Sequence, residues 1–235
     1  MGAGPHLSRP LPHFEFVTDR HERLRSAHLY LVCGDQPDEF LAGALAGGVD
    51  LVQLRMKDAS DEEIMVAGRR FAAAAAERGA LFILNDRPDL VAATGADGVH
   101  VGQDDASVAD AREAVGPERI VGLSTHSPGQ VDAAAGAPVD YIGVGPVHQT
   151  PTKPGRPAVG LELVRYAAAN APVPFFAIGG ISAANVYAVR EAGATRVAVV
   201  RALTEAPDVE LAARALRTAI GTGRHRTEVR VGSAR

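Results

Sequence analysis

Three polar side chains stand at alternate positions where an apolar run ends near residue 54. Gln53, Arg55 and Lys57 alternate with apolar residues, and alternation along a β-strand places all three on one face. One amide and two cations on a shared face form a receptor for a multiply charged anion, and a diphosphate suits it best. The other interpretation is an ordinary solvent-exposed strand end.

Carboxylates follow the next two apolar runs. Asp86 comes after the third run and Asp105 after the fourth, so neighbouring parallel strands would bring both to one edge. Mg²⁺ takes one or two carboxylates together with substrate oxygens and water. The alternative is that each aspartate caps a helix, because Pro88 and Ser107 mark helix starts nearby. Beside an anion receptor, we expect the magnesium site.

A serine and a histidine follow the fifth apolar run, as Ser124 and His126. Such a pair suggests a nucleophile and its base. However, the chain shows neither a G-x-S-x-G turn nor an evident third triad member. We therefore expect the hydroxyl of Ser124 to bind a phosphate or a heterocycle instead of acting in hydrolysis.

A second set of anion-binding signals follows the last three apolar runs. The segment from Gly145 to Gly155 is rich in glycine, proline and threonine and reaches Lys153, which is typical of an ordered anion-binding loop. Gly179-Gly180 and Arg201 follow the seventh and eighth runs, where barrels commonly bind phosphate. Two anion sites at one mouth, one of them with a metal, suit an enzyme that joins two phosphorylated substrates.

Short apolar runs alternate with longer alanine-rich stretches of helical period, which predicts parallel βαβ units. A doubly wound sheet is possible, but eight regular units favour a single (β/α)8 TIM barrel. Expected helix N-caps are Ser60 with Glu63 as a capping box, Ser107 and Ser182. The predicted strands are His28–Cys33, Leu51–Leu54, Leu81–Leu84, Gly98–Val101, Ile120–Leu123, Tyr141–Val144, Phe175–Ile178 and Arg196–Val200.

Composition excludes several classes of protein. The 235 residues carry 24 basic and 28 acidic side chains, a net charge of −4, which argues against general binding of nucleic acid or anionic membranes. Cys33 is the single cysteine, so no intramolecular disulfide or cysteine zinc cluster can form. With no signal-peptide pattern and no apolar run long enough to span a bilayer, we expect a cytoplasmic protein.

The two ends of the chain lack the pattern of the middle. Residues 1–25 are interrupted by prolines and charges and are expected to be a flexible leader, and the basic stretch 221–235 a flexible tail. Residues 26–220 then form one catalytic domain. The basic residues include only two lysines, Lys57 and Lys153, both at expected anion sites.

Taken in order from about residue 28 to 203, the strand-end motifs resemble the thiamine-phosphate synthase family. The motifs that carry the resemblance are QLRMK, ND, GVHVGQDD, GLSTH, GPVHQTPTKP, AIGGI and VAVV. The resemblance implies a (β/α)8 barrel and a transferase of thiamine biosynthesis. Such an enzyme joins hydroxymethylpyrimidine diphosphate to a thiazole phosphate and releases pyrophosphate.

The resemblance also implies roles for individual residues. Asp86 and Asp105 would hold Mg²⁺. The thiazole phosphate would be bound by Thr150, Thr152, Gly180 and the backbone around Val200 and Arg201. Catalytic roles would fall to Arg55, Lys57, Ser124 and Lys153. The pyrimidine diphosphate would be bound by Gln53, Arg55, Lys57, Asn85, Ser124 and Lys153.

Two positions depart from the family pattern: His148 stands where phenylalanine is frequent, and Arg201 where serine is frequent. Both departures concern the thiazole subsite, and the sequence leaves open whether the thiazole is carboxylated and whether the chain forms a homo-oligomer. Two alternatives are a related thiazole tautomerase and a non-catalytic barrel that binds a thiazole phosphate. Neither needs a diphosphate receptor together with a metal site.

Overall fold

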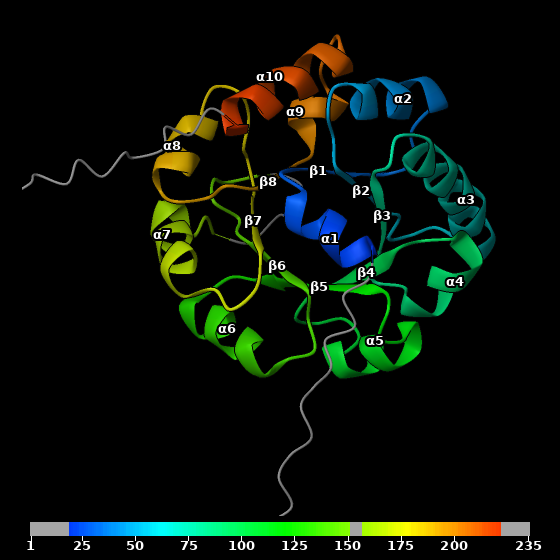
Figure 1. Ribbon diagram of the computed structural model, residues 1–235, viewed down its shortest axis with the longest axis horizontal. Coiled ribbons are helices and arrows are strands. Elements are labelled where there is room, and N and C mark those ends of the chain that lie inside the picture. The colour runs from blue at the N-terminus through cyan, green and yellow to red at the C-terminus, as the bar shows by residue number, and fades with distance from the viewer. Residues whose placement is uncertain (1–18, 151–156, 222–235) are drawn as a thin grey trace, which may run out of the picture.

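The computed structural model describes residues 19–150 and 157–221, and its strands form a closed parallel barrel (Figure 1). The strands follow one another in chain order, and β1 pairs with β8 to close the barrel, with Leu29 opposite Val197. The predicted (β/α)8 fold is therefore confirmed. The strands are β1 Leu29–Cys33, β2 Leu51–Leu54, β3 Leu81–Asn85, β4 Gly98–Val101, β5 Ile120–Thr125, β6 Tyr141–Val144, β7 Phe175–Ile178 and β8 Val197–Val199.

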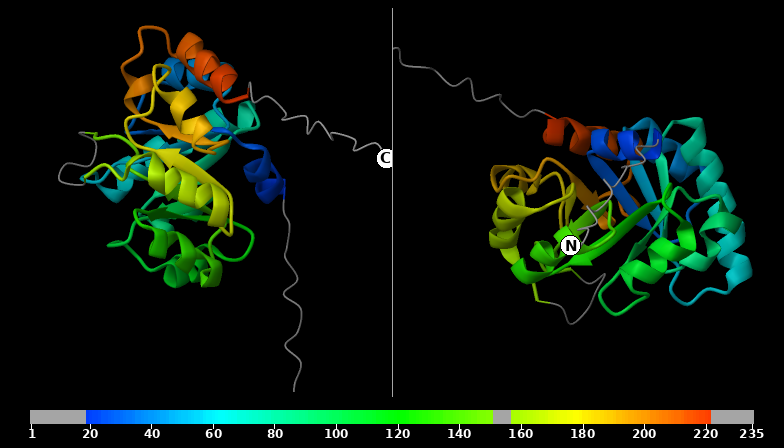
Figure 2. Two further views of the ribbon diagram at one scale, coloured as in Figure 1. Left: turned by 90° about the vertical axis from the view of Figure 1, so that its left-hand side faces the viewer. Right: turned by 60° about the horizontal axis from the view of Figure 1, so that its bottom comes forward.

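Helices surround the barrel as an outer ring, except α1, which lies across one end of it (Figures 1 and 2). Within the described residues, none of them has the length and apolar character required to cross a bilayer. Two short 3₁₀ turns, η1 Pro88–Leu90 and η2 Ala134–Gly136, complete the connections. The α-helices are α1 Asp19–Ser26, α2 Asp38–Ala46, α3 Asp61–Glu77, α4 Val91–Thr94, α5 Val108–Val115, α6 Pro128–Ala133, α7 Gly160–Asn170, α8 Val186–Glu191, α9 Arg201–Thr204 and α10 Val209–Gly221.

Two of the three predicted helix caps are confirmed. The Ser60 side chain accepts from the Glu63 backbone N–H in a complete capping box, and the Ser107 side chain accepts from the Asp110 backbone N–H at the start of α5. The prediction for Ser182 is wrong, because α8 begins only at Val186, after a turn. In that turn the Ser182 backbone N–H donates to the Asn185 side chain.

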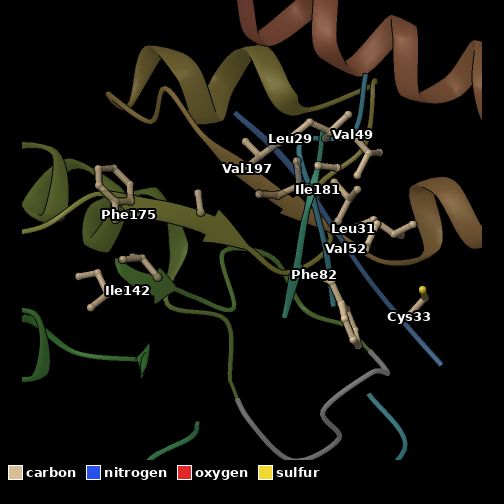
Figure 3. Packing of buried hydrophobic residues seen from close by; sticks show 14 of the residues in the cluster. Leu29, Leu31, Cys33, Val49, Val52, Phe82, Ile142, Phe175, Ile181 and Val197 are labelled. Carbon is tan, nitrogen blue, oxygen red and sulfur yellow. The ribbon is translucent and has the colours of Figure 1, made fainter. Parts of the chain in front are cut away.

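Alternation along the strands divides the buried residues into two layers. On β1, Leu29, Leu31 and Cys33 face the helices, in the layer shown in Figure 3. Tyr30 and Val32, between them, face the barrel interior. Inward-facing side chains of other strands contact Tyr30 there. Several of them also form the floor of the site described below.

Helix α1 corrects the predicted extent of the flexible leader. Residues 19–25 belong to this helix, which Figure 2 places at the opposite end of the barrel from the loop containing residues 145–150. Leu24 is 2% exposed and packs into the inner core cluster, and Arg20 pairs with Asp97 at 2.8 Å. A single buried leucine gives little helical periodicity, so tertiary contacts stabilise this helix more than its own pattern does. Residues 1–18, and the expected tail beyond Gly221, lie outside the described residues.

Candidate active site

A cavity of about 370 Å³ opens where the strands end at their carboxyl termini. Residues that follow β2, β6, β7 and β8 contribute to its wall, which is the usual position of a barrel active site. Lys57, Asp86 and Asp105 are absent from the lining, and Thr152 and Lys153 fall in the gap between the two described ranges. Among the predicted site residues, the cavity is lined by Gln53, Arg55, Asn85, Ser124, Thr150, Gly180, Val200 and Arg201.

An amide on β2 and a guanidinium directly after β2 line the cavity. Gln53 is 3% exposed, and its Nε2 donates to the Tyr30 hydroxyl at 2.5 Å. Arg55 follows it, with its backbone N–H bonded to the Cys33 carbonyl. Within the described residues the Arg55 guanidinium has no ion pair, so it can bind an anion that enters the cavity.

Lys57 extends beyond the cavity lining to the carboxylate that follows β3. Its Nζ lies 3.6 Å from Asp86 Oδ2. Asp86 has a φ of 60°, in the left-handed region that residues other than glycine seldom adopt. Its backbone N–H donates to the His100 carbonyl at 2.9 Å, and this bond ties the end of β3 to β4. Left-handed non-glycine residues cluster at functional sites, and here the strained residue carries one of the predicted metal ligands.

Asp105 lies close enough to Asp86 to perturb the ionisation of Asp86. Burial, and then the neighbouring Asp105 carboxyl, raise the pKa of Asp86, and Lys57 opposes this only in part. The competing capping interpretation is wrong for both residues: η1 has no side-chain cap, and Ser107 caps α5. Asp105 instead accepts from the Gly102 backbone N–H at 2.9 Å.

This acidic pair fits a Mg²⁺ ion that also takes oxygens from a substrate. Two facing carboxylates, one half-buried at Asp86 and one exposed at Asp105, gain stability from a divalent cation, and Mg²⁺ needs no more than one or two protein carboxylates. The described part of the chain shows no group of three or more metal-binding side chains. A magnesium ion held by this pair would need further oxygens from a substrate or from water.

Ser124 is bonded to a histidine that sequence reasoning missed. Its Oγ lies 2.9 Å from Nε2 of His100, and Nδ1 of His100 lies 3.0 Å from the Tyr141 hydroxyl. His126, the expected partner, points Nδ1 at the Gly145 carbonyl at 2.5 Å. His100 and Tyr141 sit within apolar strand runs at inward-facing positions, and that placement of polar side chains was the available signal.

The second predicted anion group comes together on the other side of the cavity. Gly179 and Gly180 have φ of 110° and 62°, and a Cβ on Gly180 would lie 2.8 Å from the Cβ of His148. The loops after β6 and β7 therefore approach each other closely, which only glycine permits. Arg201 opens α9 after β8, and its guanidinium has no ion pair with any other residue in ranges 19–150 and 157–221.

Comparison with known proteins gives one consistent result. The model of a family described as thiamine monophosphate synthase matches residues 29–203. A Thermus thermophilus protein named thiamine-phosphate synthase is 51% identical over 197 residues, covering 80% of this chain and 95% of that protein. A relative of the same name from Gloeobacter violaceus is 48% identical over 192 residues, covering 81% of this chain but only 56% of its own length.

A solved structure agrees with these relatives. A thiamine phosphate pyrophosphorylase from Pyrococcus furiosus superposes with a TM-score of 0.76 at 32% identity, covering 85% of this chain and 96% of that one. With the family match spanning all eight strands, the chain belongs to the thiamine monophosphate synthase family.

Proposed function

We propose that this chain joins hydroxymethylpyrimidine diphosphate to a thiazole phosphate, forming thiamine phosphate and releasing pyrophosphate. The observation that carries the proposal is the pair of guanidiniums, Arg55 and Arg201, that line one cavity without an ion pair in the described residues. The facing carboxylates Asp86 and Asp105 follow β3 and β4, on the same side of the barrel as β2, which Arg55 follows. We therefore assign a metal-assisted anion site to the Arg55 side of the cavity and a second anion site to the Arg201 side, as two different phosphorylated substrates require.

The pyrimidine diphosphate is assigned to the side formed by β2 to β5. Arg55 and Lys57 would bind the diphosphate oxygens, and the Gln53 amide and Ser124 hydroxyl lie deeper in the barrel. Asn85 lines the same wall. Lys153 is proposed for this group from the sequence resemblance alone.

Asp86 and Asp105 are proposed to hold the Mg²⁺ ion. When bound, Mg²⁺ supplies charge neutralisation to the diphosphate as negative charge grows on it. Lys57 Nζ lies 3.6 Å from Asp86 Oδ2 and would also contact the bound diphosphate. Lys57 would therefore hold the diphosphate beside the Asp86–Asp105 pair.

The chain's cations make the diphosphate a good leaving group. Arg55 and Lys57 stabilise the charge that develops as the bond to the pyrimidine methylene breaks. The electron-rich aminopyrimidine can carry the positive charge left on that carbon, so departure before attack is feasible. No covalent protein nucleophile is needed, consistent with Ser124 being bonded to His100 outside any triad.

The thiazole phosphate is assigned to the loops after β6, β7 and β8. Its phosphate would be bound by the Gly180 and Val200 backbone, the Thr150 side chain and Arg201. Thr152 joins this set by resemblance. Holding the phosphate places the thiazole nitrogen beside the pyrimidine carbon, and positioning of this kind supplies much of the rate enhancement.

Pyrophosphate release tests the proposal directly. The purified chain is supplied with both substrates, with Mg²⁺ or with a chelator, and with each substrate omitted in turn. We expect release only when both substrates and Mg²⁺ are present. A tautomerase or a non-catalytic binding barrel would release none under any condition, and that result would refute the proposal.

A further inference from the structure

A chain of five hydrogen-bonded side chains crosses the floor of the cavity. It runs from Gln53 on β2 through Tyr30 on β1 and Tyr141 on β6 to His100 on β4 and Ser124 on β5. The successive donor–acceptor distances are 2.5, 2.9, 3.0 and 2.9 Å. All five residues line the cavity, so the chain links two proposed substrate contacts, Gln53 and Ser124, through three residues with no assigned role.

The direction of every bond in this chain follows from its first donor. The Gln53 amide nitrogen can only donate, so the Tyr30 hydroxyl accepts this bond. Tyr30 must then donate its own hydroxyl hydrogen bond to Tyr141. Burial raises the pKa of both tyrosines, which keeps both hydroxyls protonated. Tyr141, having accepted from Tyr30, then donates to Nδ1 of His100.

The histidine passes this direction on to the serine. With Nδ1 acting as acceptor, the single proton of the neutral imidazole resides on Nε2, because the bond at one ring nitrogen sets the proton at the other. Nε2–H then donates to Ser124 Oγ, and the Ser124 hydroxyl proton is left to point into the cavity.

The opposite direction leaves a buried proton unsatisfied. If His100 Nδ1–H donated to Tyr141, and Tyr141 to Tyr30, the Tyr30 hydroxyl would accept two bonds. Its own proton would then have no acceptor within the described residues. Tyr30 is 2% exposed, and an unmet buried donor costs far more than a typical hydrogen bond contributes.

We propose that Tyr30, Tyr141 and His100 are positioning residues. The two tyrosines hold His100 as its Nε2–H tautomer, and His100 in this form turns the Ser124 hydroxyl proton toward the substrate diphosphate. The last step rests on the proposed function; the tautomer and the bond directions do not. A hydroxyl held as a donor stabilises negative charge growing on a leaving diphosphate. The same hydroxyl turned to His100 would present a lone pair and repel that charge.

Nitrogen NMR of the ligand-free, ¹⁵N-histidine-labelled protein tests the tautomer. The His100 resonances are identified by their loss in His100→Gln. We expect a protonated Nε2 and an unprotonated Nδ1 in the wild type, and a mixture of tautomers in Tyr141→Phe, which keeps the ring but removes the donor. Protonation at Nδ1 in the wild type would overturn the proposal, and so would an unchanged tautomer in Tyr141→Phe.

Kinetics test whether His100 acts through Ser124. We expect His100→Leu to lower kcat about tenfold or more, as loss of a hydrogen bond to a developing charge does. His100→Gln, whose amide can still donate to Ser124, should recover most of that loss. KM for the thiazole phosphate should stay unchanged in both variants.

A double-substitution cycle separates positioning from general structural damage. In a Ser124→Ala background, His100→Leu should cause little further loss of kcat, because its effect is transmitted through the missing hydroxyl. Independent, additive losses would refute the positioning role. If the wild type itself released no pyrophosphate, the proposed function and the serine–diphosphate step would fail, while the NMR result would still decide the tautomer.

Discussion

The ammonium nitrogen of Lys57 lies 3.6 Å from Oδ2 of Asp86, so the cation after β2 is paired with the strained carboxylate after β3. The Lys57 side chain is 49% exposed, and the two residues of the pair follow Arg55 and Asn85, which line the cavity. A surface ion pair of this kind contributes little to stability. Its value lies in placing a compact point charge between the acidic pair and an incoming diphosphate.

Lys57→Arg should therefore lower turnover by at least about tenfold, although the charge is conserved. The planar guanidinium has a fixed fork of donors, whereas the ammonium can turn between two partners. Initial rates of pyrophosphate release at saturating substrates measure the effect. We expect the same loss for Lys153→Arg, on the sequence resemblance alone.

Arg165→Lys is a matched control for these changes. Arg165 pairs with Glu162 on the exposed face of α7, and its substitution should leave the rate unchanged. A near-normal rate for Lys57→Arg would mean that catalysis does not require lysine at this position. The presence of lysine there, in a chain whose other basic residues are nearly all arginine, would then have no catalytic reason.

Asp86→Asn should stabilise the metal-free protein while abolishing turnover. Burial and the Asp105 carboxyl raise the pKa of Asp86 in the folded state. The protonated form is thus favoured by folding, and the stability it contributes at low pH is lost as the pH rises through the raised pKa. At neutral pH the amide removes this penalty, and asparagine tolerates a φ of 60° well.

Thermal melts with and without Mg²⁺ measure this prediction. We expect a higher Tm than wild type without Mg²⁺, and no further rise when Mg²⁺ is added. Asp89→Asn is the control of opposite sign, because Arg87 lowers the pKa of Asp89, and neutralising it should not stabilise the fold. A lower Tm for metal-free Asp86→Asn would contradict the assignment of repelling carboxylates.

Arg201→Ala should weaken binding of the thiazole phosphate and leave the chemical step intact. Its guanidinium lines the cavity on the side away from the acidic pair. Losing one charge-assisted contact to a phosphate should raise KM for that substrate about tenfold, with kcat within about twofold of wild type. KM for the pyrimidine diphosphate should stay constant. A rise in that KM alone would show that Arg201 binds the pyrimidine diphosphate and not the thiazole phosphate.

The barrel was predictable because its strands carry a simple pattern. Each is a short, nearly continuous apolar run buried on both faces, and glycines or capping serines mark many helix ends. Gln53 and Arg55 were predictable for the same reason, since strand alternation carries them into the cavity. Lys57, two residues further, lies beyond the end of β2 and contacts Asp86 instead.

Features that depend on contacts between distant segments were not predictable. Helix α1 is held by Arg20 on Asp97 and by Arg23 on backbone carbonyls at the start of β3, none of which has a local sequence signal. The bond between His100 and Tyr141 joins residues 41 positions apart. Pattern reasoning therefore located the ends of the strands but missed the polar network beneath them.

Gly122→Ala should destabilise the fold by about 1–3 kcal/mol, the usual cost of overfilling a packed core. Gly122 lies on β5, and a Cβ there would stand 2.2 Å from Cζ of Tyr141 and 2.5 Å from its hydroxyl oxygen. Tyr141 is fully buried and packs edge-on against Tyr30 and Phe176, so it cannot move aside freely. Gly129→Ala in α6 is the matched control, because a Cβ there meets no atom within 4 Å and alanine favours the helix. Urea unfolding should lower the midpoint for Gly122→Ala and keep or raise it for Gly129→Ala; equal midpoints would show that the ring of Tyr141 is not confined as described.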